Sequence, residues 1–175
     1  MGHEKLDKIR AAVNTAVYHA ICDDPSFSID VPKLSPDLWE RVSVQTPENK
    51  EENERLEFLG DKLMDSSIAI ALYKGVPDGT PHKYTVSAYQ ASVAASTGLG
   101  GKVMLSVLHA NRTFCHLARK MQIDYRGADT KNIGDIFEVI VGAYYTEKGF
   151  EAVHAWAFRI YEPLVRDASI AFDEW

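Results

Sequence analysis

The sequence has few cysteines, no long apolar run and no excess of positive charge, and each of these absences excludes a class of protein. Its 175 residues include only two cysteines, Cys22 and Cys115, without a CxxC spacing. We therefore expect free thiols in an intracellular, reducing compartment (cytoplasm, nucleus or mitochondrion) rather than a disulfide-stabilised secreted fold. No stretch approaches the roughly 18 unbroken apolar residues of a membrane-spanning helix. The charged first residues are also unlike a secretory leader, so we expect no membrane partner.

Positive charge is scarce as well. The formal net charge is −6 at pH 7, and the isoelectric point is about 5.5. This balance argues against a protein that binds nucleic acid by broad electrostatic attraction. It is compatible with an acidic site that binds cations first.

Apolar residues recur at helical spacing along the chain, without an alternating strand pattern or an internal repeat. The sequence predicts an all-α fold, with helices over residues 3–22, 36–43, 53–74, 84–106, 113–122, 132–149 and 151–175. Asn53 is expected to cap the third helix, and Pro163 to kink or split the last one. The length suits a single domain, with an N-terminal helix and linker over residues 1–35 and a core over residues 36–175.

Two of these helices carry acidic faces. One residue advances about 100° around an α-helix, so Glu54, Glu57, Asp61 and Asp65 share one narrow face opposite a leucine stripe. A single acidic face of this kind is usually only solvated. The segment after Asn132, however, adds a second acidic pair that also lies opposite an apolar stripe.

That second pair is Asp135 and Glu138, with Gly142 on the same face, where another backbone or a substrate could approach closely. If the two apolar stripes join one core, the four carboxylates Glu57, Asp61, Asp135 and Glu138 could converge at its edge. Unpaired carboxylates repel one another, and a divalent cation resolves this. Oxygen ligands without nearby Cys or His favour Mg²⁺ or Mn²⁺ over Zn²⁺, and such sites usually act on phosphates.

These segments resemble a known family. NERLEFLGD, residues 53–61, is similar to the signature motif of ribonuclease III nuclease domains, and GDIFEVIVGAYY, residues 134–145, to the family's second motif. The resemblance implies an all-α, dimeric helical bundle and a Mg²⁺-dependent endoribonuclease of double-stranded RNA that leaves short 3′ overhangs during RNA processing. The motif positions of the catalytic, metal-binding carboxylates are matched by Glu57, Asp61, Asp135 and Glu138. Glu54 matches a supporting acidic position.

The same resemblance implies two kinds of contact. The family uses the aromatic matched by Phe58 to dock into the partner subunit, so we expect Phe58 at a homodimer interface rather than in the core. We expect no double-stranded RNA-binding domain after the nuclease block, which leaves RNA to local contacts. The candidates for these contacts are the loop residues His82, Lys83, Arg126 and Lys131. Arg126 and Lys131 could equally serve only to keep the surface soluble.

Two alternatives to this function remain. The first is a non-catalytic RNA-binding protein or mitochondrial ribosomal protein on the same fold, against which the four retained carboxylates count. The second is an accessory subunit that works in a heterodimer.

Overall fold

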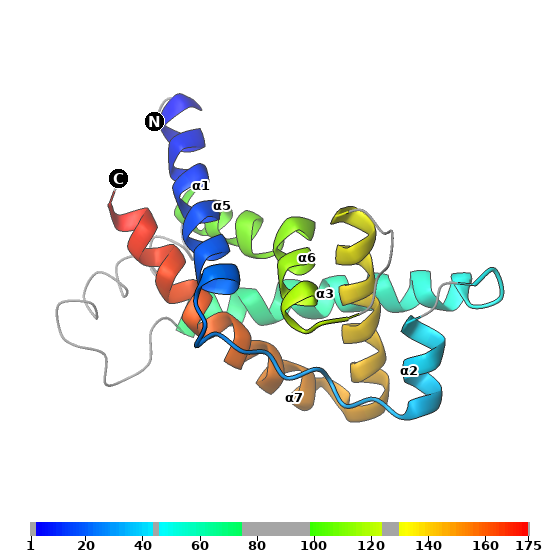
Figure 1. The fold of residues 1–175 in the computed structure, drawn as a ribbon. Coiled ribbons are helices and arrows are strands. Elements are labelled where there is room, and N and C mark those ends of the chain that lie inside the picture. Colours follow the sequence, from blue (N-terminus) through cyan, green and yellow to red (C-terminus); the bar gives the residue numbers. More distant parts are fainter. Residues whose placement is uncertain (1–2, 44–45, 75–98, 124–129, 175) are drawn as a thin grey trace. The chain divides into compact units, whose positions relative to one another are not determined.

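The computed structural model describes residues 3–43, 46–74, 99–123 and 130–174, and every regular element in these ranges is helical (Figure 1). The all-α prediction is confirmed. No helix in the described ranges is long and apolar enough to cross a membrane. In chain order the elements are α1 (His3–Tyr18), the π-helical turn η1 (His19–Asp23), α2 (Pro36–Ser43), α3 (Lys50–Lys74), α5 (Leu99–Leu108), α6 (Asn111–Lys120) and α7 (Thr130–Asp173).

The predicted helix over residues 36–43 is confirmed as α2, and α3 ends at Lys74 as predicted. The predicted start of α3 is wrong, because Asn53 lies inside the helix and is buried. Its N–H donates to the carbonyl of Asn49 at 2.9 Å, so Asn49 is the residue that precedes the helix. Glu51 and Glu52 in the first turn favour this earlier start, since negative side chains interact well with a helix N-terminus.

The observed boundaries of the first helix and of α6 lie closer to the predicted ones. The first predicted helix is α-helical to Tyr18 and closes in the π-helical turn, and α6 begins two residues before the predicted start at residue 113. Of the predicted helix over residues 84–106, the part over 84–98 lies outside the described residues.

Helix α7 consists of two helical segments that meet at Gly149, where the sequence predicts a helix end. Gly149 has a φ of 78° and a ψ of 177°, a conformation that glycine adopts without a steric penalty. The sequence predicts a kink or a split at Pro163. The split is wrong, because the second segment continues through this proline, and the kink stays a prediction. Tyr161, Leu164 and Val165 are buried around it, and this packing offsets the loss of one backbone hydrogen bond.

The chain divides into two compact units. Unit 1 contains Met1–Phe27, Ile68–Ala110 and Phe158–Trp175, and unit 2 contains Ser28–Ser67 and Asn111–Ala157. The division into an extension over residues 1–35 and a core over residues 36–175 stays a prediction.

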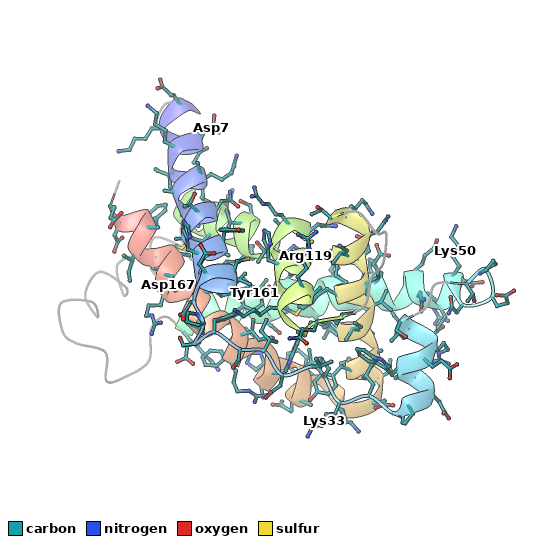
Figure 2. All side chains as sticks on the ribbon, viewed as in Figure 1. Asp7, Lys33, Lys50, Arg119, Tyr161 and Asp167 are labelled. Carbon is teal, nitrogen blue, oxygen red and sulfur yellow. The ribbon has the colours of Figure 1, made fainter. Side chains whose placement is uncertain are left out.

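Unit 1 has its own apolar interior. Helix α1 packs against α5, and Ile21, Met104 and Leu108 are fully buried. Tyr161 (labelled in Figure 2) is fully buried as well, and its hydroxyl donates to the carbonyl oxygen of Leu108 at 3.2 Å. This bond satisfies a polar group that would be costly to bury alone.

Unit 2 has an aromatic core that joins α6 to α7. The rings of Phe114 and Phe137 stack with centroids 5.0 Å apart, and Trp156 lies 6.0 Å from Phe137. The indole N–H of Trp156 donates to the carbonyl oxygen of Asp30 at 2.8 Å. These contacts attach α6 to the first segment of α7, which carries the second acidic motif, and the segment before α2 to Trp156 in the second segment.

Candidate functional site

Two glycines let α3 and α7 touch backbone to backbone within unit 2. A Cβ atom on Gly60 would lie 1.9 Å from the carbonyl oxygen of Glu138, and one on Gly142 would lie 2.2 Å from that of Leu56. Neither distance leaves room for a side chain, so both positions require glycine. In Figure 1 this crossing is where the cyan part of α3 meets the yellow part of α7. The close approach predicted at Gly142 is confirmed, whereas the one at Gly60 was not predicted.

The crossing brings acidic side chains of the two motifs together. Glu57 of α3 and Asp135 and Glu138 of α7 each offer a carboxylate oxygen, and these oxygens lie within 4.8 Å of one another. Asp135 and Glu138 are buried, and Glu57 is partly buried. Asp61 is not in this group of three, and its carboxylate pairs with Lys62 at 2.6 Å. The structure therefore gathers three of the four predicted carboxylates and leaves the fourth beside them.

Burial and nearby negative charge make two of the grouped carboxyl groups, those of Glu57 and Glu138, hard to ionise. The pKa of Glu138 is raised from 4.5 to about 8, first because burial disfavours the charged form. The negative charges that raise it further are those of Asp61, Asp135 and Glu57. The pKa of Glu57 is also raised, by burial and then by the charge of Asp135. A group of this kind favours the binding of a proton or a cation.

Asp135 is held by one partner on each oxygen. The side-chain amide of Asn111 donates to Oδ1 at 3.0 Å, and the ammonium of Lys131 donates to Oδ2 at 2.6 Å. Asn111 begins α6, and a Cβ on Gly134 would lie 3.0 Å from its carbonyl oxygen, so glycine lets the two helices approach. No sequence pattern pointed to Asn111, because it lies 24 positions before Asp135 on another helix.

Lys131 is one of the four predicted RNA contacts, and its predicted loop position is wrong. It lies in the first turn of α7, because that helix begins at Thr130 rather than at residue 132. Its contact with RNA stays a prediction. The other three, His82, Lys83 and Arg126, lie outside the described residues.

The two remaining predicted residues lie on α3 outside the carboxylate group. Glu54 is exposed and pairs with Lys50 (labelled in Figure 2) at 3.7 Å, and its charge contributes to the raised pKa of Glu57. Phe58 is 68% exposed, with the ammonium of Lys62 at 5.9 Å from the ring centroid. An aromatic side chain this exposed on the described surface is available to a partner, although the interface itself stays a prediction.

The donor set suits a hard divalent cation. The three grouped ligands are all carboxylates, without Cys or His among them, and such oxygen ligands favour Mg²⁺ or Mn²⁺. Asp135 and Glu138 are also buried, and a buried carboxyl group that ionises requires a compensating positive charge. The arrangement can therefore hold a cation that binds a phosphate and activates a water molecule.

The chain is similar to curated bacterial proteins named Ribonuclease 3. It is 32% identical over 107 residues to the one from Chlorobium luteolum, a match that covers 61% of this chain and 37% of that protein. It is 26% identical over 166 residues to the one from Verminephrobacter eiseniae, and this match covers 80% of this chain and 66% of that protein. It is 29% identical over 170 residues to the one from Dinoroseobacter shibae, and this match covers 89% of this chain and 69% of that protein.

The chain spans less than two thirds of the length of the first two of these relatives. No protein-family model matches the chain, and no solved structure does.

Proposed function

Because the chain belongs to the ribonuclease III family, we propose that it is a metal-dependent endoribonuclease that hydrolyses double-stranded RNA. The observation that carries this proposal is the group of Glu57, Asp135 and Glu138, whose oxygens lie within 4.8 Å of one another. These residues come from the two segments that resemble the family's motifs. A group of carboxylates from two packed helices suits phosphodiester hydrolysis with a hard cation.

In this proposal Glu57, Asp61, Asp135 and Glu138 hold Mg²⁺, or Mn²⁺ in its place. The bound cation would activate a water molecule and stabilise negative charge on the phosphate and the leaving oxygen. The chain contributes the positions of these groups. The glycine crossing of α3 and α7 keeps the two motifs in register, and the amide of Asn111 holds Asp135 in place.

The resemblance to the family extends the proposal to assembly and product. Two copies of the chain would form a homodimer with two sites, each cutting one strand and together leaving short 3′ overhangs. A heterodimer with a related chain would present the same two sites. Neither Cys22 nor Cys115 forms a disulfide in the described part of the chain, which supports function in a reducing, intracellular compartment.

The chain is expected to cleave a perfect RNA duplex in the presence of Mg²⁺ and to stop when the ion is removed with EDTA, because the carboxylates need a cation to act on a phosphate. Gel electrophoresis of end-labelled RNA measures the cleavage, and sequencing of the product ends tests the overhang. Single-stranded RNA of the same sequence and duplex DNA are the controls. Duplex binding without cleavage in either Mg²⁺ or Mn²⁺ would instead favour the non-catalytic RNA-binding alternative.

Substitution of Phe58 by Ala is expected to weaken the dimer by at least about tenfold, because a buried aromatic anchor contributes a few kcal/mol to an interface. Sedimentation over a range of protein concentrations measures the dissociation constant. Tyr73→Ala is the matched control, since Tyr73 is another exposed aromatic of α3, with 78% of its surface exposed. An unchanged dimer in Phe58→Ala would remove Phe58 from the proposed interface.

A further inference from the structure

We propose that Lys131 is a built-in counter-ion that covers Asp135 until a divalent cation displaces it. This inference rests on the proposed function, because it concerns the same carboxylates. It goes beyond that function because it assigns to Lys131 control over how tightly the site binds its cation.

The two oxygens of Asp135 have partners of different kinds. Oδ1 accepts a hydrogen bond from the amide of Asn111, which belongs to α6, at 3.0 Å. Oδ2 is paired at 2.6 Å with Lys131, which lies one turn earlier on the same helix. Asn111 can therefore keep the carboxylate in position while Lys131 leaves, and Oδ2 becomes free for another cation.

Lys131 is placed so that it can leave at little cost. Its side chain is 72% exposed, whereas that of Asp135 is only 11% exposed. Release of the ammonium into water breaks one ion pair whose lysine is exposed, and Oδ1 of Asp135 keeps its hydrogen bond from Asn111. The lysine stem is flexible and its ammonium acts as a compact point charge. A divalent cation, in contrast, can bind several of the grouped carboxylates at once, so its total electrostatic attraction exceeds that of the single Lys131–Asp135 pair.

Lys131 also serves the site when no divalent ion is bound. Its positive charge acts on Glu57 and Glu138 as well as on Asp135, so one flexible side chain reduces the repulsion of the whole group. Lys62 makes a similar contact with Asp61 at 2.6 Å. Lys131 therefore lowers the cost of negative charge in this group when no divalent cation is bound, but the cation must then compete with Lys131.

The competition is tested by titrating the full chain, freed of divalent ions, with Ca²⁺ and with Mn²⁺ in a calorimeter. Lys131→Met is expected to bind either ion about two- to fivefold more tightly than the unaltered chain, because the ion no longer competes with an ion pair whose lysine is exposed. The difference should shrink at high salt, where charges are screened. Lys131→Arg keeps the charge and is expected to bind the ions no more tightly than the unaltered chain.

Arg112→Gln is the matched control. Arg112 is exposed, lies next to Asn111, and makes no ion pair with a carboxylate in the described part of the chain. Its loss removes a positive charge nearby without exposing Oδ2 of Asp135, so cation affinity should change much less than in Lys131→Met.

Thermal melting gives a second readout. Without divalent ions, Lys131→Met should melt at a lower temperature than the unaltered chain. Added Ca²⁺ should raise the melting temperature of Lys131→Met more than that of the unaltered chain. A lysine that only supported the fold would lower the melting temperature without tightening cation binding, so unchanged or weaker binding in Lys131→Met would overturn the proposal. These measurements use no RNA, so their failure and a failure to cleave RNA can be told apart.

Discussion

Glu138→Gln is expected to reduce duplex cleavage by at least about a thousandfold while leaving the fold intact. Glu138 is one of the three grouped carboxylates, and glutamine keeps its shape but loses the negative charge that a divalent cation requires. A loss of a few kcal/mol of transition-state stabilisation is enough for this effect, since each 1.4 kcal/mol is worth about a factor of ten. Single-turnover cleavage at saturating Mg²⁺ measures it.

The same substitution should change how stability depends on pH. The pKa of Glu138 is about 8 in the folded protein, against 4.5 for an ordinary glutamate. Between these values the folded state binds a proton that the unfolded state has lost, so the free energy of unfolding decreases as the pH rises from about 4.5 through about 8. Without divalent ions, the melting temperatures of the two proteins should be similar at pH 5, and Glu138→Gln should be the more stable at pH 9.

Glu51→Gln provides the control for both measurements, because Glu51 is exposed in the first turn of α3 and lies outside the carboxylate group. Cleavage by Glu138→Gln at a rate near that of the unaltered chain would remove Glu138 from the catalytic assignment. Equal melting temperatures of the two proteins at every pH would contradict the raised pKa.

Gly60→Ala is expected to destabilise the protein and to abolish cleavage, although alanine normally stabilises a helix relative to glycine by about 1 kcal/mol. The added Cβ would lie 1.9 Å from the carbonyl oxygen of Glu138, so α3 and α7 must move apart. Forced overpacking of this kind costs about 1–3 kcal/mol or more, which corresponds to a decrease of roughly 2–12 °C in melting temperature for a chain of this length. Thermal melting and the cleavage assay measure the two effects.

Gly134→Ala is the graded comparison. There the nearest atom is the carbonyl oxygen of Asn111 at 3.0 Å, so a small shift can relieve the contact and the loss of stability should be smaller. If Gly60→Ala were as stable as the unaltered chain, the helix crossing would not depend on contact between the two backbones.

Much of the helical fold could be predicted because its signals are local. Leu56 and Leu63 repeat at helical spacing and are buried as expected, and Pro36 begins α2 as a helix-start signal suggests. The helix starts that were wrong, at Asn53 and at residue 132, reflect competition among several polar residues that can each precede a first turn. At Pro163, packing of the surrounding helix prevailed over the local preference of proline.

For the candidate site, the sequence predicted which residues are acidic but not how they are held. Glu57, Asp135 and Glu138 could be found because periodicity places them on two acidic faces and because both segments resemble family motifs. The contacts that hold them join distant parts of the chain, as Asn111 does with Asp135. Residues of this kind carry no periodic pattern, so only the folded arrangement of α3, α6 and α7 reveals them.

The backbone contact between α3 and α7 has a consequence for how tolerance to mutation should be interpreted at this site. In a library of variants selected only for resistance to proteolysis, positions 60 and 142 should return glycine, because any side chain there collides with a carbonyl oxygen. Positions 57, 135 and 138 should accept neutral replacements in that selection. A second selection, for RNA cleavage, should remove the variants that carry these replacements. Intolerance to substitution would thus have two separate origins within one small region, steric exclusion at the glycines and chemistry at the carboxylates.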